Sequence, residues 1–75
     1  MKVYDIKYGT KVRLLEDAKI PPAAIPVNKG DIITICDLDG LYCNGYNANG
    51  DRVYIAAYTE VEIYNKYSEW IQSTQ

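Results

Sequence analysis

The chain has 75 residues and a formal net charge of −2, with eight basic and ten acidic side chains. Its length allows one domain at most, and its 48% hydrophobic and 24% charged residues are typical of a folded globular protein and exclude a disordered one. The charge balance gives no general attraction to nucleic-acid phosphates, and the absence of histidine removes the commonest general base and metal ligand.

The first fifteen residues predict one clear strand. Residues 1–9 alternate weakly and are expected to form a short strand or extended lead-in that ends at Gly9. Residues 10–15 alternate apolar and polar side chains, which predicts a strand with Lys11 and Arg13 outward. The side chains expected to pack inward are Val3, Ile6, Tyr8, Val12 and Leu14.

Residues 16–28 contain all three prolines of the chain: Pro21, Pro22 and Pro26. Proline lacks the backbone donor that a strand needs and restricts the residue before it, so a long irregular loop is expected. Its apolar side chains are expected to fold back over the domain. An alternative is a polyproline ligand for a partner, but the spacing is not the usual proline, two residues, proline.

Two similar tetrapeptides, Asp37–Gly40 and Asn47–Gly50, separate three predicted strands. Each begins with a short polar side chain and ends in glycine, which favours a three-residue hairpin loop closed by a left-handed glycine. The alternative is a pair of two-residue loops, in which Asp39-Gly40 and Asn49-Gly50 form mirror-image turns. The two possibilities send different side chains to the interior, because a one-residue slip inverts a strand.

Burial favours the three-residue loops. They give a wholly apolar inner face of Ile33, Ile35, Leu41, Cys43, Gly45, Val53, Ile55 and Ala57. The outer face then carries Ile32, Thr34, Cys36, Tyr42, Asn44, Tyr46, Arg52 and Tyr54. Two-residue loops would place Arg52 on the face of Leu41 and Cys43.

Residues 59–63 alternate once more and are expected to complete the sheet, with Val61 and Ile63 inward. Residues 1–63 therefore predict an all-β domain, a small five-stranded barrel with a long proline-bearing loop. Residues 64–75 are a C-terminal extension, in which aromatic side chains at helical spacing predict a short docked helix.

Cys36 and Cys43 are predicted to be free thiols. In the chosen register they point to opposite faces of the sheet, which is incompatible with a disulfide, and two cysteines without histidine are too few for a structural zinc site. Free thiols fit a reducing compartment.

Residues 27–63 resemble a Src homology 3-like domain of bacterial or phage type. Residues 29–35, Lys-Gly-Asp followed by alternating apolar side chains, are similar to the strand after that family's diverging turn. Residues 39–42 match its acidic and glycine-containing turn, Asn49-Gly50 its distal hairpin, and residues 54–58 the region of its short helical turn. The resemblance implies a small β-barrel.

Departures from the family motif argue against binding of proline-rich peptides. In peptide-binding members the groove uses a tyrosine-rich segment, a tryptophan and a proline. Here Leu41 holds the tryptophan position, Ala56 or its neighbour holds the proline position, and Tyr4-Asp5 alone resembles the tyrosine-rich segment.

No motif for catalysis, phosphate binding or calcium binding is present, so we expect a non-enzyme without cofactor or metal. Two carboxylate pairs, Asp37 with Asp39 and Glu60 with Glu62, are interpreted as solvated side chains. An export signal and a membrane-spanning run are not evident, which predicts a cytoplasmic location and no membrane partner.

The expected binding surface consists of Tyr42, Asn44, Tyr46, Arg52 and Tyr54 on the outer face. Tyrosine and arginine are enriched where proteins bind proteins, so the first hypothesis is a small protein-interaction module. We expect an accessory protein, carried by a phage or plasmid, that binds and modulates a host protein in the host cytoplasm. The alternative is a single-stranded nucleic-acid binder that combines the tyrosines with Lys11, Arg13 and Arg52. Self-association through the tyrosines or Trp70 is a further possibility.

Overall fold

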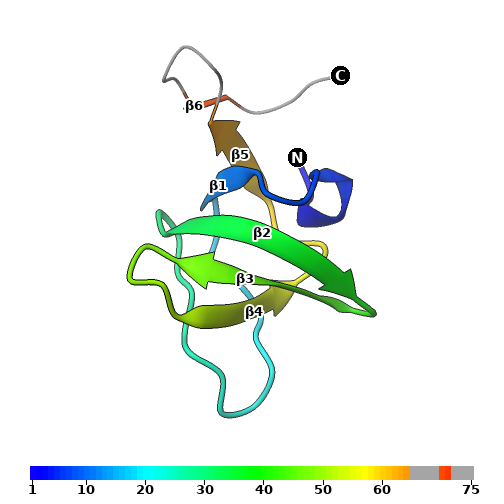
Figure 1. The fold of residues 1–75 in the computed structure, drawn as a ribbon, viewed down its shortest axis with the longest axis vertical. Coiled ribbons are helices and arrows are strands. Elements are labelled where there is room, and N and C mark those ends of the chain that lie inside the picture. Colours follow the sequence, from blue (N-terminus) through cyan, green and yellow to red (C-terminus); the bar gives the residue numbers. More distant parts are fainter. Residues whose placement is uncertain (65–69, 72–75) are drawn as a thin grey trace.

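The computed structural model describes residues 1–64 and 70–71. The strands within these residues form one antiparallel sheet (Figure 1). The elements are a single 3-10 turn η1 (Val3–Asp5) and strands β1 (Lys11–Leu14), β2 (Ile32–Asp39), β3 (Tyr42–Asn47), β4 (Arg52–Ala56), β5 (Val61–Tyr64) and β6 (Trp70–Ile71). The strand order in the sheet is β4-β3-β2-β1-β5-β6. The prediction of an all-β domain with five principal strands is confirmed.

The predicted closure of a barrel is not found, because no ladder among the described residues joins the β4 edge to the opposite end of the sheet. Two other segments, the long loop and the N-terminal turn, form hydrogen bonds with residues at and after the end of β4. The N–H of Ala56 donates to the carbonyl oxygen of Lys19 at 2.8 Å, and the N–H of Val3 donates to that of Thr59 at 3.0 Å. The long loop and the N-terminal turn are thus joined to the chain near the end of β4 by individual hydrogen bonds and not by a ladder.

The hydrophobic core lies on the inner face of the curved sheet. Its buried members are Val3, Ile6, Val12, Leu14, Val27, Ile33, Ile35, Cys43, Val53, Ile55 and Val61. The inward directions predicted for β1, β4 and Val61 are therefore correct. The proline-bearing loop folds back in part, since Val27 is buried while Ile25 is 43% exposed.

The second hairpin has the predicted three-residue loop. The N–H of Asn47 donates to the carbonyl oxygen of Asp51 at 3.0 Å, and Gly50 has a φ of 85°, in the left-handed region. The Asn47 side chain accepts hydrogen bonds from the N–H groups of Asn49 and Asp51, both at 2.9 Å. The asparagine therefore caps the turn, as its position in the tetrapeptide predicts.

The first hairpin differs from both predicted loops. Asp39 pairs with Tyr42, so the loop consists of Gly40 and Leu41, and a bulge at Cys36 absorbs the extra residue on β2. Gly40 has a φ of 65° and Leu41 does not have a positive φ, which is the pattern of a type II′ turn with glycine first. Leu41 is 77% exposed, and its predicted place on the inner face is wrong.

The two ends of the chain also differ from prediction. Residues 3–5 form a 3-10 turn rather than a strand, and Tyr8, predicted to pack, is 62% exposed. No α-helix is found in the part of the C-terminal extension that the structure describes. Tyr64 belongs to β5 and Trp70–Ile71 forms β6, which pairs with β5. Residues 65–69 and 72–75, the rest of the predicted helical extension, lie outside the described residues.

Candidate functional site

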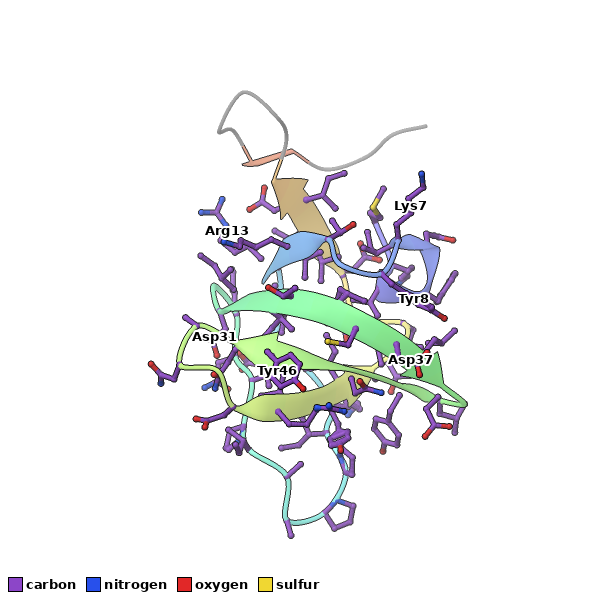
Figure 2. All side chains as sticks on the ribbon, viewed as in Figure 1. Lys7, Tyr8, Arg13, Asp31, Asp37 and Tyr46 are labelled. Atoms are coloured by element: carbon purple, nitrogen blue, oxygen red, sulfur yellow. The ribbon has the colours of Figure 1, made fainter. Side chains whose placement is uncertain are left out.

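The five predicted site residues lie together on the outer face of β3 and β4, and we call them the outer-face cluster. Across the ladder Tyr46 pairs with Arg52 and Asn44 pairs with Tyr54, while Tyr42 occupies the alternate position along β3. Tyr46 is 38% exposed and Tyr54 is 37% exposed. Figure 2 shows Tyr46 over β3. The pleat has therefore brought together residues that are up to twelve positions apart in the sequence.

Arg52 connects the members of the outer-face cluster. Its Nη1 donates to Oδ1 of Asn44 at 3.2 Å, and its Nη2 donates to the hydroxyl of Tyr46 at 2.7 Å. Its guanidinium carbon lies 4.8 Å from the centroid of the Tyr46 ring, within range of a cation–π interaction. The hydrogen bond with Tyr46 raises the pKa of Arg52 above its ordinary value. The guanidinium is held in one place although it is exposed.

A groove of about 520 Å³ lies beside this cluster, between β4 and the proline-bearing loop. Arg52 and Tyr54 line one side, and Pro21, Pro22, Ala23, Ala24 and Ile25 line the other. The sequence predicted that this loop packs over the domain, with a polyproline ligand as the alternative, and did not predict a groove. The density of prolines indicated a stiff segment, but its position against β4 depends on tertiary contacts such as the bond from Ala56 to Lys19.

A second groove of about 350 Å³ lies beside the N-terminal turn, and sequence reasoning did not find it. It is lined by Val3, Tyr4, Ile6, Lys7, Tyr8, Ile35, Leu38 and Cys43. Its exposed members include Tyr4 and Tyr8, and Figure 2 shows Lys7 and Tyr8 on the N-terminal segment. The only sequence feature that pointed to this region was the isolated Tyr4-Asp5. The groove is also lined by residues on both sides of the β2 bulge, and the sequence pattern did not predict that bulge.

Of the carboxylates predicted to be solvated, Glu60 and Glu62 are each paired with a cation, and the Glu62 side chain is only 12% exposed. Glu60 bonds to Nζ of Lys2 at 2.6 Å, which lowers the pKa of Glu60, and Glu62 accepts a hydrogen bond from Nε of Arg13 at 2.7 Å. Asp37 and Asp39 are exposed at the end of β2. Among the described residues no group of three or more histidine, cysteine, aspartate or glutamate side chains could hold a metal ion, and no helix is long and apolar enough to cross a membrane.

The two cysteines are free, as predicted. Cys36 lies at the bulge and is partly exposed, whereas Cys43 is buried in the core. Burial raises the pKa of the Cys43 thiol to about 11, because the thiolate is poorly solvated there. A thiol that stays protonated at neutral pH is a weak nucleophile.

Comparisons with known proteins give no match: no family model, curated protein or solved structure matches the chain.

Proposed function

We propose that this protein is a small, non-catalytic protein-interaction module that contacts its partner through the outer-face cluster. The observation that carries the proposal is the placement of Arg52, held by two neutral hydrogen-bond acceptors beside two exposed tyrosines. Tyrosine and arginine are, with tryptophan, the residues enriched at binding hot spots. Side chains that are already ordered lose less entropy on binding, which favours affinity.

We further propose a fold family and a biological setting for this module. The antiparallel meander from β1 to β4, with β5 beside β1, supports a Src homology 3-like module. Small size and the lack of catalytic motifs support an accessory protein of a phage or plasmid, acting on a host protein in the host cytoplasm. In this setting the module binds its target and changes the target's activity by occupying a surface.

The experiment is capture of the partner from a host lysate, identification by mass spectrometry, and titration of the purified partner. Tyr46→Ala and Tyr54→Ala are expected to weaken binding by about 30-fold each, the loss typical of hot-spot residues. The matched control is Tyr58→Ala, since Tyr58 is 49% exposed and lies outside the outer-face cluster. Equal binding by all three variants would reject the outer-face cluster as the contact surface.

A second candidate function, binding of single-stranded nucleic acid, has one favourable observation. Lys11 and Tyr46 line a common depression of about 330 Å³, next to the guanidinium of Arg52. Against it, Arg13 is paired with Glu62, so one of the three cations invoked for this function is neutralised. Titration of labelled oligothymidylate at low and high salt tests it, because phosphate binding weakens steeply with salt. No binding at low salt removes this candidate.

A further inference from the structure

The outer edge of β4 carries backbone groups that no strand of the sheet uses. The N–H of Asn47 bonds to Asp51 and the N–H of Ala57 bonds to Leu41, so the hydrogen-bonded pairs of the β3–β4 ladder involve the odd-numbered residues from 51 to 57. In an antiparallel ladder the alternate residues direct their N–H and C=O groups the other way. The N–H and C=O groups of Arg52, Tyr54 and Ala56 therefore point away from β3.

The chain itself uses this edge at one end and leaves the rest open. The N–H of Ala56 donates to Lys19 at the start of the proline-bearing loop. Within the part of the chain that the structure describes, the edge groups of Arg52 and Tyr54 have no comparable bond. In Figure 1 the loop that follows Lys19 extends beyond β4, on the side away from β3. The groove of about 520 Å³ runs between this loop and the open edge.

The far wall of the groove is stiff and apolar. The prolines at 21 and 22 have restricted φ angles, and the N–H of Ala24 donates to the carbonyl oxygen of Pro21 at 3.2 Å. Ala23 closes this turn with a φ of 66°, a left-handed conformation that is unfavourable for a residue with a Cβ. Strained backbone of this kind is found preferentially at binding sites, and a preformed wall lowers the entropy lost on binding.

The groove also has a charge that the described residues leave unmatched. No described carboxylate lies within salt-bridge distance of Arg52, whose bonded acceptors are the neutral Asn44 and Tyr46. A guanidinium has five N–H donors, and Arg52 uses two of them in these bonds. The remaining donors can bind a carboxylate, and such charge-assisted bonds are stronger than bonds between neutral groups.

We propose that the partner of this module supplies an extended acidic segment that adds to the sheet as a new antiparallel strand at the open edge of β4. Its backbone bonds to Arg52 and Tyr54, an acidic side chain binds the guanidinium of Arg52, and apolar side chains lie against Pro21, Pro22 and Ile25. Strand addition obtains affinity from main-chain bonds and specificity from alternate side chains. This inference rests on the proposed interaction function and specifies its binding mode.

The probe is an eight-residue peptide of alternating valine and glutamate, titrated by fluorescence anisotropy. Binding is expected below about 1 mM, and a valine–lysine peptide of the same length is expected to bind at least about tenfold more weakly. In antiparallel pairing with glutamate opposite Arg52, the glutamate N–H groups face β4. N-methylation of the glutamates should therefore reduce affinity about tenfold, and N-methylation of the valines should change it less than about twofold. No binding, or equal loss for both methylated peptides, overturns the proposal.

Variants of the protein test the main-chain hydrogen bond that the N–H at position 54 would donate to the added strand. Tyr54→Pro and Tyr54→Val both remove the ring, but only proline removes the edge N–H, and proline is tolerated where that N–H faces solvent. Tyr54→Pro is expected to bind the probe about tenfold more weakly than Tyr54→Val, with the fold of each checked by circular dichroism. In the unaltered protein, saturating probe should slow exchange of the Arg52 and Tyr54 amides at least about tenfold. Equal affinity of the two variants, or unchanged exchange, overturns the proposal.

Two outcomes separate this inference from the proposed function. Partner binding that depends on Tyr46 and Tyr54 side chains, with Tyr54→Pro equal to Tyr54→Val, retains the module and rejects strand addition. Probe binding at the edge, with partner binding insensitive to the outer-face cluster, rejects the proposed contact surface. A sedimenting species of twice the monomer mass, lost in Tyr54→Pro, would identify a second copy as the occupant and overturn the acidic-segment proposal.

Discussion

Gly45 lies directly opposite Ile35 across the β2–β3 ladder, at the last pair before the bulge at Cys36. A methyl group at Gly45 would meet the carbonyl oxygen of Thr34 and would approach Cγ2 of Ile33 to 3.1 Å. Because one of these atoms belongs to the backbone, a substitution cannot be relieved by a side-chain rotation. The close approach of β2 and β3 at this point requires glycine.

Gly45→Ala is therefore expected to lower the free energy of unfolding by about 3 kcal/mol, the upper end of the usual cost of overpacking a core. Urea unfolding followed by circular dichroism measures the change. The matched control is Gly50→Ala, where the added methyl meets open space but the φ of 85° is unfavourable, at a cost of about 1–2 kcal/mol. A smaller loss at position 45 than at position 50 would contradict this account.

Asn47→Ala is expected to destabilise the second hairpin. The Asn47 side chain accepts two backbone hydrogen bonds at 2.9 Å, from Asn49 and Asp51, and alanine removes the acceptor. The expected loss in the free energy of unfolding is about 1–2 kcal/mol for two exposed bonds. Asn47→Asp retains an acceptor and should recover most of the stability in the same unfolding measurement. If aspartate and alanine are equally destabilising, the turn does not depend on this cap.

The pKa of Glu60 is expected to lie below its ordinary value of 4.5, chiefly because Lys2 bonds to its carboxylate. A carboxyl group with a lowered pKa in the folded state stabilises the protein above its ordinary pKa, and this contribution is lost as the pH falls through the lowered value. A carbon-detected NMR titration measures the shift. Lys2→Met should raise the pKa toward 4.5. Lys7→Met should leave it unchanged, because the ion pairs of Glu60 are with Lys2 and the N-terminal ammonium group.

Cys43 is expected to resist alkylation in the folded protein, while Cys36 reacts. Burial raises the pKa of the Cys43 thiol from 9.0 to about 11, so little thiolate forms at neutral pH, and the thiolate is the reactive species. Iodoacetamide labelling followed by peptide mass spectrometry compares the two sites, with urea-unfolded protein as the reference for equal reactivity.

The raised pKa of Cys43 also predicts how the stability of the folded protein changes at alkaline pH. The thiol stabilises the folded state fully below pH 9, and this contribution is lost as the pH rises through about 11. Cys43→Ala should therefore show a smaller loss of stability between pH 9 and 11 than the unaltered protein does. Labelling of Cys43 as fast as Cys36 in the folded state would contradict its burial.

The two hairpins show how much of the strand register can be predicted from local sequence patterns. In the second, the Asn47 side chain caps the turn and Gly50 adopts the left-handed conformation that closes it, and the predicted register was correct. In the first, Ile35 pairs with Gly45, whereas the three-residue loop favoured from the sequence would place Cys43 opposite Ile35, a difference of two residues. Because strand side chains alternate with a period of two, Cys43 remains inward although its partner changed, and Leu41 moved into the exposed loop.

The outer-face cluster was predictable because its members alternate along two strands joined by a correctly predicted loop. The groove beside it was not, since it depends on where residues 21–25 lie against β4. The predicted C-terminal helix failed at Trp70–Ile71, where pairing with β5 replaces helical bonds. Aromatic spacing alone could not anticipate that a strand edge was available.

The amino-acid sequence by itself determined the all-β class, the five principal strands with most of their inward side chains, and the five side chains of the outer-face cluster, because alternation and turn chemistry act over a few residues. Tertiary structure alone decided the bulge at Cys36, the absence of a closing ladder and the open edge of β4. The position of the proline-bearing loop beside that edge depends on contacts between segments far apart in the chain, such as the bond from Ala56 to Lys19, and a local sequence pattern contains no information on their energies.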